Sequence, residues 1–305
     1  MRERAAKLIR ESEVFIITAG AGMGVDSGLP DFRGDHGFWK AYPAYNRLGL
    51  SFAECATPRH FADDPHFAWG FYGHRTNLYR DTIPHDGFHI IKKWIAMNSA
   101  EYFVVTSNVD GQFQKAGYEE ERIHEVHGSI HWLQCQARCN DRIWRNEEVF
   151  QIDETTMRAC DQLPLCPVCG RVCRPNILMF GDNSWLQGRV IAQSNAFDRF
   201  LKANAARKIA VIEIGAGTAI STIRTISERL GRKLKHATVI RINPREPRIR
   251  SPHLSMSCGA LEGLQRIDNL FHFQTKLTES ICESQTDSLH PNPATIYVTP
   301  QSYPG

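Results

Sequence analysis

Four of the nine cysteines are spaced as metal ligands. Cys135 and Cys139 are separated by three residues, and Cys166 and Cys169 by two, with a glycine directly after the second pair. Two such pairs are typical of a structural zinc site, in which four thiolates leave no open coordination position for catalysis. The spacing therefore predicts a zinc ribbon in this part of the chain.

The other cysteines leave alternatives open. Cys160 and Cys173 lie close enough in the sequence to replace one ligand, and a metal-free insert with buried thiols is the competing interpretation. An odd number of cysteines without a secretory signal argues against a disulfide framework. The remaining cysteines are expected to be unpaired thiols.

A glycine-rich turn follows a short apolar segment near the N-terminus. Residues 14–18 are mostly apolar and β-branched, and Gly20, Ala21 and Gly22 come shortly after them. A buried strand that leads into such a turn is typical of nucleotide-binding α/β folds, where backbone N–H groups and a helix N-terminus hold a pyrophosphate. A tight turn without a ligand explains these three residues equally well.

Two pairs of polar side chains are spaced so that each pair can face one site. Asn108 and Asp110 are two residues apart in a loop after a predicted strand, so both can face one cavity; an Asx turn is the alternative. Tyr72 and Arg75 are three residues apart in a predicted helix, which places them on one face of that helix.

The composition limits the class of protein. The chain has 305 residues, of which 42% are hydrophobic and 23% charged, as in ordinary globular proteins. The formal net charge is only +3, so nucleic acid is not expected as a partner. No apolar run reaches the ~18 residues needed to span a bilayer, and the charged N-terminus resembles no secretory signal. We therefore expect a cytoplasmic protein without a membrane partner.

The pattern of apolar residues predicts strands alternating with helices. The expected strands are residues 14–18, 102–106, 122–126, 177–180, 209–214 and 238–242. The expected helices are residues 67–79, 88–97, 112–116, 189–205 and 219–230. This alternation predicts an α/β fold with a doubly wound, mostly parallel, Rossmann-like sheet.

Two segments interrupt this alternation. Residues 35–84 are rich in aromatic residues and proline and predict a helical module, and residues 133–174 form the cysteine-rich insert. Residues 1–34, 85–132 and 175–275 then make up the nucleotide-binding domain. The polar, proline-containing residues 276–305 predict a loosely ordered tail.

A series of short motifs makes the nucleotide interpretation specific. Residues 20–22 are followed by Ser27-Gly28-Leu29-Pro30-Asp31-Phe32-Arg33-Gly34, and later by Thr106-Ser107-Asn108-Val109-Asp110-Gly111 and Glu125-Val126-His127-Gly128-Ser129. After the cysteine pairs come Arg174-Pro175-Asn176, Phe180-Gly181-Asp182, Gly217-Thr218 and Asn243. In this order the chain resembles the sirtuins, the NAD-dependent protein deacylases, over roughly residues 14–265.

The resemblance implies an enzyme that transfers an acyl group from protein lysine to NAD, giving nicotinamide, O-acyl-ADP-ribose and free lysine. His127 is then the base that deprotonates a ribose hydroxyl, a task that suits a side chain with a pKa near neutrality. Asn108 would position the ribose and a water, and Asp110 would bind the nicotinamide carboxamide. These three residues are the expected catalytic set.

The resemblance also implies how NAD is held. Phe32 and Arg33 would belong to a mobile loop whose aromatic ring shields the reactive ribose, Thr218 would contact phosphate, and Asn243 the adenosine ribose. Asn243 precedes a proline, so a turn is its alternative role. The expected cofactor contacts are Gly20, Ala21, Gly22, Asp31, Phe32, Arg33, Ser107, Asn108, Asp110, Gly217, Thr218 and Asn243.

For the acyl-lysine substrate, the resemblance points to two regions. Residues 177–181, with Ile177, Phe180 and Gly181, would pair with the peptide backbone. Tyr72 and Arg75 match the Tyr-x-x-Arg pair that sirtuins specific for succinyl or malonyl groups use to bind the acyl carboxylate. Simple packing with a surface ion pair, in a deacetylase, is the alternative for this pair.

Three positions depart from the family pattern. Gly24, Ser107 and Ala219 stand where the family usually has Ser, Gln and Ser, and each change removes a hydrogen bond worth about 1 kcal/mol. An ADP-ribosyltransferase or NAD hydrolase is therefore an alternative function, and a weakly catalytic NAD-binding module is a second. The protein substrate and the oligomeric state are not predicted.

Overall fold

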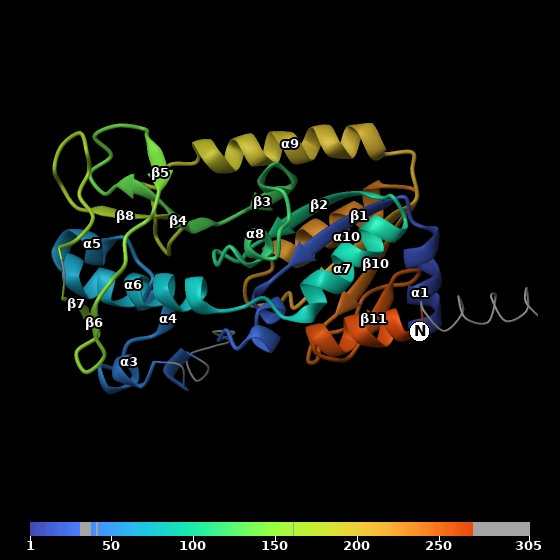
Figure 1. The fold of residues 1–305 in the computed structure, drawn as a ribbon, viewed down its shortest axis with the longest axis horizontal. Helices are drawn as coiled ribbons and strands as arrows, with labels where there is room; N and C mark the ends of the chain where they lie inside the picture. Colours follow the sequence, from blue (N-terminus) through green and yellow to red (C-terminus); the bar gives the residue numbers. More distant parts are fainter. Residues whose placement is uncertain (31–37, 41, 161, 271–305) are drawn as a thin grey trace, which may run out of the picture.

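A parallel β-sheet forms the centre of the larger part of the molecule (Figure 1). The computed structural model describes residues 1–30, 38–40, 42–160 and 162–270, and within them this sheet has six strands in the order β11-β10-β9-β1-β2-β3. Every neighbouring pair is parallel. The strands are β1 (Val14–Ala19), β2 (Glu101–Thr106), β3 (Ile123–Glu125), β9 (Ile209–Ile214), β10 (Ala237–Ile242) and β11 (Leu254–Met256).

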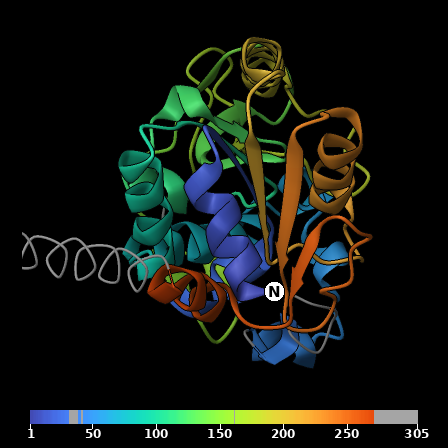
Figure 2. The same ribbon diagram turned by 90° about the vertical axis from the view of Figure 1, so that its right-hand side faces the viewer.

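Helices cover both faces of this sheet (Figure 2). One face carries α1 (Arg2–Glu11), α7 (Asp86–Met97), α8 (Gln112–Lys115) and the helical residues 260–270. The other carries α9 (Gly188–Asn204) and α10 (Thr222–Lys233). Because side chains alternate along a strand, Phe15 and Ile17 pack on the first face, and Val14 and Ile16 on the second. The predicted doubly wound, parallel sheet is confirmed.

A smaller unit lies beside the sheet (Figure 1) and joins segments far apart in the sequence. It holds an antiparallel sheet of β5 (Ile143–Arg145), β4 (Gly128–Cys135) and β8 (Cys173–Ile177), and a hairpin of β6 (Ile152–Asp153) and β7 (Arg158–Ala159). Its helices are α3 (Pro43–Arg47), α4 (Phe52–Cys55), α5 (Arg59–Asp63) and α6 (Pro65–Asp81).

Aromatic packing joins the helical module to the cysteine-rich insert. The ring of Trp69 on α6 stacks on Phe150 at 4.6 Å between centroids, and its Nε1 donates to the carbonyl oxygen of Cys173 at 2.9 Å. The predicted divisions at residues 132/133 and 174/175 fall within β4 and β8. These two strands therefore connect the smaller unit to the sheet.

One predicted strand is wrong in position and partner. The expected strand at residues 177–180 is instead β8, which begins at Cys173, ends at Ile177 and pairs antiparallel with β4 rather than joining the parallel sheet. Arg174, Pro175 and Asn176 look like loop residues, but all three are buried. The polar side chains among them are hydrogen-bonded to partners, which a hydrophobicity pattern does not register.

Shorter elements complete the described chain. The glycine turn leads into 3-10 turns η1 (Ala21–Met23) and η2 (Val25–Ser27), and η3 (Glu120–Arg122) precedes β3. The strand β11 was not predicted, and the predicted tail, residues 276–305, lies outside the described residues. In the part of the chain that the structure describes, no helix combines the length and the apolar character needed to cross a membrane.

A buried ion pair ties β9 to β10. Arg241 donates from Nε to Oε1 of Glu213 at 2.5 Å and from Nη2 to Oε2 at 2.9 Å, and both side chains are at most 1% exposed. Glu228 on α10 accepts a further bond from Nη2 at 2.9 Å. Each charge depends on its partner, because an isolated charge at this depth is very costly.

We predict that Glu213→Ala lowers the free energy of unfolding by about 3–5 kcal/mol, since it leaves the Arg241 guanidinium buried without its main partner. The double variant Glu213→Met/Arg241→Met is expected to recover most of this loss. Chemical denaturation measures both. Asp63→Asn, in an exposed pair with Arg59, serves as the control and should change stability by less than about 0.5 kcal/mol. A loss below about 1 kcal/mol for Glu213→Ala would contradict the prediction.

Candidate functional site

Two glycine turns meet where the chain changes direction across the sheet. β1 and β9 are neighbours, and the turns that follow them pack directly on each other. Gly22 donates from its N–H to the carbonyl of Gly215 at 3.1 Å. A Cβ on Gly20 would lie 2.8 Å from that carbonyl oxygen, and Gly215 has a positive φ of 62°. In doubly wound sheets this switch point is where ligands bind.

A cavity of about 610 Å³ opens at this point. It is lined by the loops after β1, β2 and β9, by α4 and α6 of the smaller unit, and by the segment after β8. Its volume lies within the range of ordinary small-molecule sites. Both structural units therefore contribute walls to one site.

The loop after β2 places Asn108 and Asp110 on the cavity wall. The N–H of Asn108 donates to Oγ1 of Thr106 at 3.0 Å, and its Nδ2 donates to the carbonyl of Gly20 at 3.1 Å, so its side chain links this loop to the glycine turn. The carboxyl of Asp110 accepts from the N–H of Gln112 at 3.0 Å. Asp110 thus makes an Asx turn, which the sequence left open, and still borders the cavity.

Asp110 is a buried acid with an altered pKa. Only 8% of the residue is exposed, and burial raises its pKa from the ordinary 3.8 to about 6, with a smaller contribution from the negative charge of Glu125. A carboxyl group that titrates near neutrality can accept or donate a hydrogen bond at little cost. It is suited to hold a polar, uncharged group such as a carboxamide.

His127 lies on the same cavity, directly before β4. Burial lowers the pKa of its imidazole from the ordinary 6.5, although an interaction with the Ser107 backbone opposes the shift. The ring is therefore neutral at neutral pH. Gly128 has a φ of +80°, and a Cβ there would lie 2.1 Å from the carbonyl oxygen of Asn176, so only glycine brings His127 this close to β8.

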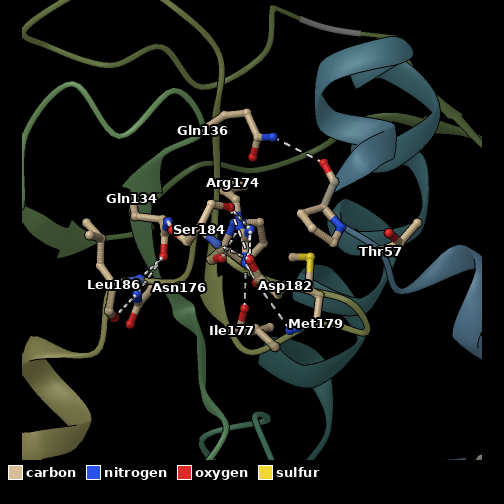
Figure 3. Close-up of polar contacts among 12 residues, drawn as sticks. Thr57, Gln134, Gln136, Arg174, Asn176, Ile177, Met179, Asp182, Ser184 and Leu186 are labelled. Carbon is tan, nitrogen blue, oxygen red and sulfur yellow. Dashed lines mark hydrogen bonds and ion pairs between the residues drawn. The ribbon is translucent and has the colours of Figure 1, made fainter.

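The segment after β8 is held by a buried ion pair (Figure 3). Arg174 binds both carboxylate oxygens of Asp182, and both side chains are fully buried. Arg174 Nη2 also donates to the carbonyl of Ile177 at 2.7 Å, and the N–H of Met179 donates to Asp182 at 3.3 Å. The buried pair therefore fixes this wall of the cavity from its interior side.

Tyr72 and Arg75 line the other end of the cavity, and both are almost fully buried. The Arg75 guanidinium carbon lies 5.1 Å from the ring centroid of Phe71 and 5.7 Å from that of Phe52. Aromatic faces stabilise a cation that has been withdrawn from water. This end of the cavity thus presents a positive charge in poorly hydrated surroundings.

At the opposite end, Thr218 is already hydrogen-bonded. Its N–H and its hydroxyl both donate to the carboxylate of Glu246, the first at 3.0 Å. Asn243 lies behind the wall, fully buried: its Nδ2 donates to Ala216 at 2.8 Å, and its Oδ1 accepts from the N–H groups of Arg245 and Glu246. A phosphate that binds Thr218 must displace the carboxylate of Glu246. Asn243 fixes the loop that carries Glu246.

The four predicted metal ligands converge. The sulfurs of Cys135, Cys139, Cys166 and Cys169 all lie within 4.8 Å of one another, and two of the pairs are 3.6 Å apart. A tetrahedral zinc site with bonds of about 2.3 Å separates its sulfurs by about 3.8 Å, so the cluster fits zinc. Among the described residues, Cys160 and Cys173 are not part of this cluster.

Most of the predicted site residues share one cavity. Those on its wall are Gly20, Ala21, Ser107, Asn108, Asp110, His127, Gly217, Thr218, Tyr72, Arg75, Ile177 and Phe180. Gly22, Gly181 and Asn243 are not on the wall, and Asp31, Phe32 and Arg33 lie outside the described residues. The individual roles of these residues stay predictions.

Several wall residues were not predicted from the sequence, among them Tyr79 and Glu246. Tyr79 could have been found, because it follows Arg75 by four residues and so lies on the same helical face. Glu246 gave no signal, since it reaches the cavity through a loop whose path depends on buried contacts.

Comparisons with known proteins agree with this geometry. The Sir2 family model matches residues 20–210. An NAD-dependent protein deacylase of Thermus thermophilus is 30% identical over 269 residues, which cover 86% of this chain and 92% of the relative. One of Thermococcus kodakarensis is 32% identical over 183 residues, covering 60% of this chain and 65% of the relative.

Solved structures show the same fold. A mutant Sir2 homologue in complex with ADP-ribose matches with a TM-score of 0.66 at 25% identity, covering 91% of this chain and 99% of that one. A Sir2 homologue in complex with NAD matches with a TM-score of 0.62 at 23% identity, covering 88% and 93%. The described architecture is therefore that of these proteins.

We predict that the purified protein carries one zinc ion per chain, because the four sulfurs already have the spacing of a tetrahedral site. Cys166→Ser should lose the zinc and lower the unfolding temperature of the protein. Cys160→Ser is the matched control, since its exposed thiol is outside the cluster, and it should keep full zinc content. Elemental analysis of each purified variant measures the zinc content. Zinc retained by Cys166→Ser would refute the assignment of Cys166 as a ligand.

The raised pKa of Asp110 predicts a stability effect. Its burial favours the protonated acid, so the stabilising contribution is present below pH 3.8 and is lost as pH rises through about 6. Asp110→Asn should therefore raise the free energy of unfolding by about 1–3 kcal/mol near pH ~8 and leave it nearly unchanged near pH ~4. Denaturation at both pH values measures the effect, with Asp63→Asn as control. An equal change at both pH values would contradict this origin.

Proposed function

Since the chain belongs to the Sir2 family, we propose that it is an NAD-dependent protein-lysine deacylase. The reaction gives nicotinamide, O-acyl-ADP-ribose and free lysine. The observation that carries the proposal is that His127, Asn108 and Asp110 share one cavity, which lies at the switch point of the sheet and is walled by a segment able to hold a peptide.

The cavity suits NAD. The glycines let the turns after β1 and β9 pack on each other at the switch point of the sheet, where doubly wound folds bind their ligands, and the buried carboxyl of Asp110 suits the nicotinamide carboxamide. Asn108 is fixed to the glycine turn by its Nδ2 and so can orient the ribose between these two ends. When bound, NAD supplies a ribose carbon with nicotinamide as its leaving group.

His127 acts as the general base in this proposal. Its imidazole accepts the proton from a ribose hydroxyl so that the acyl group can move to that oxygen. Burial lowers the pKa and keeps the ring neutral at neutral pH, which is the form that accepts a proton. Retention of this base favours deacylation over NAD hydrolysis or ADP-ribosyl transfer, since neither of these needs a base at the ribose hydroxyl.

The segment after β8 is the proposed peptide-binding edge. The N–H groups of Leu178, Met179 and Phe180 already donate to acceptors within the chain. Their carbonyl oxygens are therefore the groups that can accept from the N–H groups of an extended peptide. Leu178 and Phe180 are 40% and 44% exposed, which leaves apolar surface for the acyl-lysine stem.

The class of acyl group follows from the charged end of the cavity. Tyr72 and Arg75 offer a phenol and a guanidinium, which together bind a carboxylate well. We therefore propose that succinyl or malonyl groups are accepted along with acetyl. Cytoplasmic localisation and the absence of a nucleic-acid partner also belong to the proposal; the former is supported by thiols that zinc binding requires to be reduced.

We predict that incubation with NAD and acetyl-, succinyl- or malonyl-lysine peptides yields O-acyl-ADP-ribose, detected by mass spectrometry. His127→Ala should slow product formation by about 10²–10⁴-fold, the usual contribution of a general base. His89→Ala, an exposed histidine on α7, is the matched control and should react at the parent rate. The rate should rise with pH through a pKa below 6.5 and then level off.

Other outcomes separate the alternatives. Free ADP-ribose formed without peptide would indicate an NAD hydrolase, and ADP-ribosylated peptide would indicate a transferase. NAD binding without turnover would indicate a binding module. His127→Ala with the parent rate would refute the base even if deacylation itself is observed.

A further inference from the structure

Tyr79 stands at the acyl end of the cavity without a role in the function proposed above. It lies on α6 one helical turn after Arg75, and its phenol oxygen accepts two hydrogen bonds from that guanidinium, from Nε at 3.0 Å and from Nη2 at 2.5 Å. Two donors on one acceptor fix both the direction of the guanidinium plane and the position of the phenol oxygen.

The phenol group of Tyr79 retains one hydrogen-bond donor, its own O–H. An oxygen that accepts two N–H bonds still carries its own O–H as a donor. Among the described residues, the hydrogen bonds of the Tyr79 hydroxyl are the two from Arg75, and no acceptor for its proton is found. The residue is 5% exposed and borders the cavity, so a group bound in the cavity can supply the missing acceptor.

The surroundings make this end selective for negative charge. Among the described residues, the Arg75 guanidinium carbon lies within 6 Å of the ring centroids of Tyr72 at 5.9 Å and Tyr79 at 5.3 Å, in addition to those of Phe52 and Phe71. These rings exclude water that would otherwise screen the cation. A carboxylate that reaches this position gains charge-assisted bonds in a poorly hydrated site, where they are strongest.

The backbone of Tyr79 is also fixed. The buried side chain of Gln112 donates from Nε2 to the carbonyl of Tyr79 at 3.1 Å and to that of Thr82 at 3.4 Å. The N–H of the same Gln112 donates to the carboxyl of Asp110. The end of α6 is thus held against the loop that carries Asp110, and this restrains the phenol as a ligand enters.

We propose that Tyr79 is a specificity-determining residue: its hydroxyl, aligned by Arg75, donates to the terminal carboxylate of an acidic acyl group such as succinyl. The inference rests on the proposed deacylase function and deepens it. The Tyr79 hydroxyl would be a third polar group beside Tyr72 and Arg75. The preference for acidic acyl groups then depends on a hydroxyl that can be removed while the aromatic ring stays in place.

The test compares Tyr79→Phe with the parent protein on succinyl- and acetyl-lysine peptides of one sequence. The ratio of kcat/KM for succinyl over acetyl should fall about tenfold, mainly through a higher KM for the succinyl peptide. Tyr102→Phe is the matched control, because that hydroxyl accepts from the N–H of Glu119 away from the cavity, and its ratio should equal the parent's.

Binding without NAD gives a second readout. Fluorescence anisotropy of labelled peptides should show that the parent binds the succinyl peptide more tightly than the acetyl peptide and that Tyr79→Phe loses this difference. An equal fall in activity on both peptides would assign Tyr79 a structural role and overturn the inference, as would a parent protein that shows no preference for succinyl in binding or turnover.

The two proposals fail separately. If no peptide is deacylated, the proposed function fails, and the anisotropy comparison alone decides the inference. If the acetyl peptide is turned over and the succinyl peptide is neither bound nor turned over, the deacylase function stands and the inference is wrong.

Discussion

The buried ion pair between Arg174 and Asp182 is the interaction on which the site depends most. It joins the start of β8 to the segment before α9, and it holds the carbonyl of Ile177 and the N–H of Met179 in the same network. Both charges are fully buried, so removing either one would leave the other buried without a partner. The pair thereby places one wall of the cavity against His127, although neither residue lines the cavity itself.

The site also depends on the contact between the sheet and the smaller unit. Arg189 at the start of α9 pairs with Glu125 of β3 at 2.5 Å and lies 4.7 Å above the ring of Trp132 on β4. Glu125 is two residues before His127 and contributes to the raised pKa of Asp110. A shift of the smaller unit would therefore change both the position of the base and the charge near the neighbouring acid.

The sequence predicts the parallel sheet and the cysteine cluster well, because apolar runs and cysteine spacing can both be recognised within a short stretch of residues. The strand at residues 209–214 matches β9, and the spacing of cysteines is a local property. β8 was misplaced because Arg174 and Asn176 are buried through partners that hydrophobicity cannot indicate. Glu246 was missed for the same reason: its position follows from hydrogen bonds that exist only after folding.

The order of strands has a consequence for synthesis of the protein. β1 is an apolar central strand, yet its partners β2 and β9 begin at residues 101 and 209. At about 5–20 residues per second, the ribosome needs roughly 10–40 s to supply β9 after β1 has emerged. During that time an apolar strand has an unpaired edge in the nascent chain. The sheet is completed only late in translation, so the yield of folded protein depends on keeping this segment from other contacts until then.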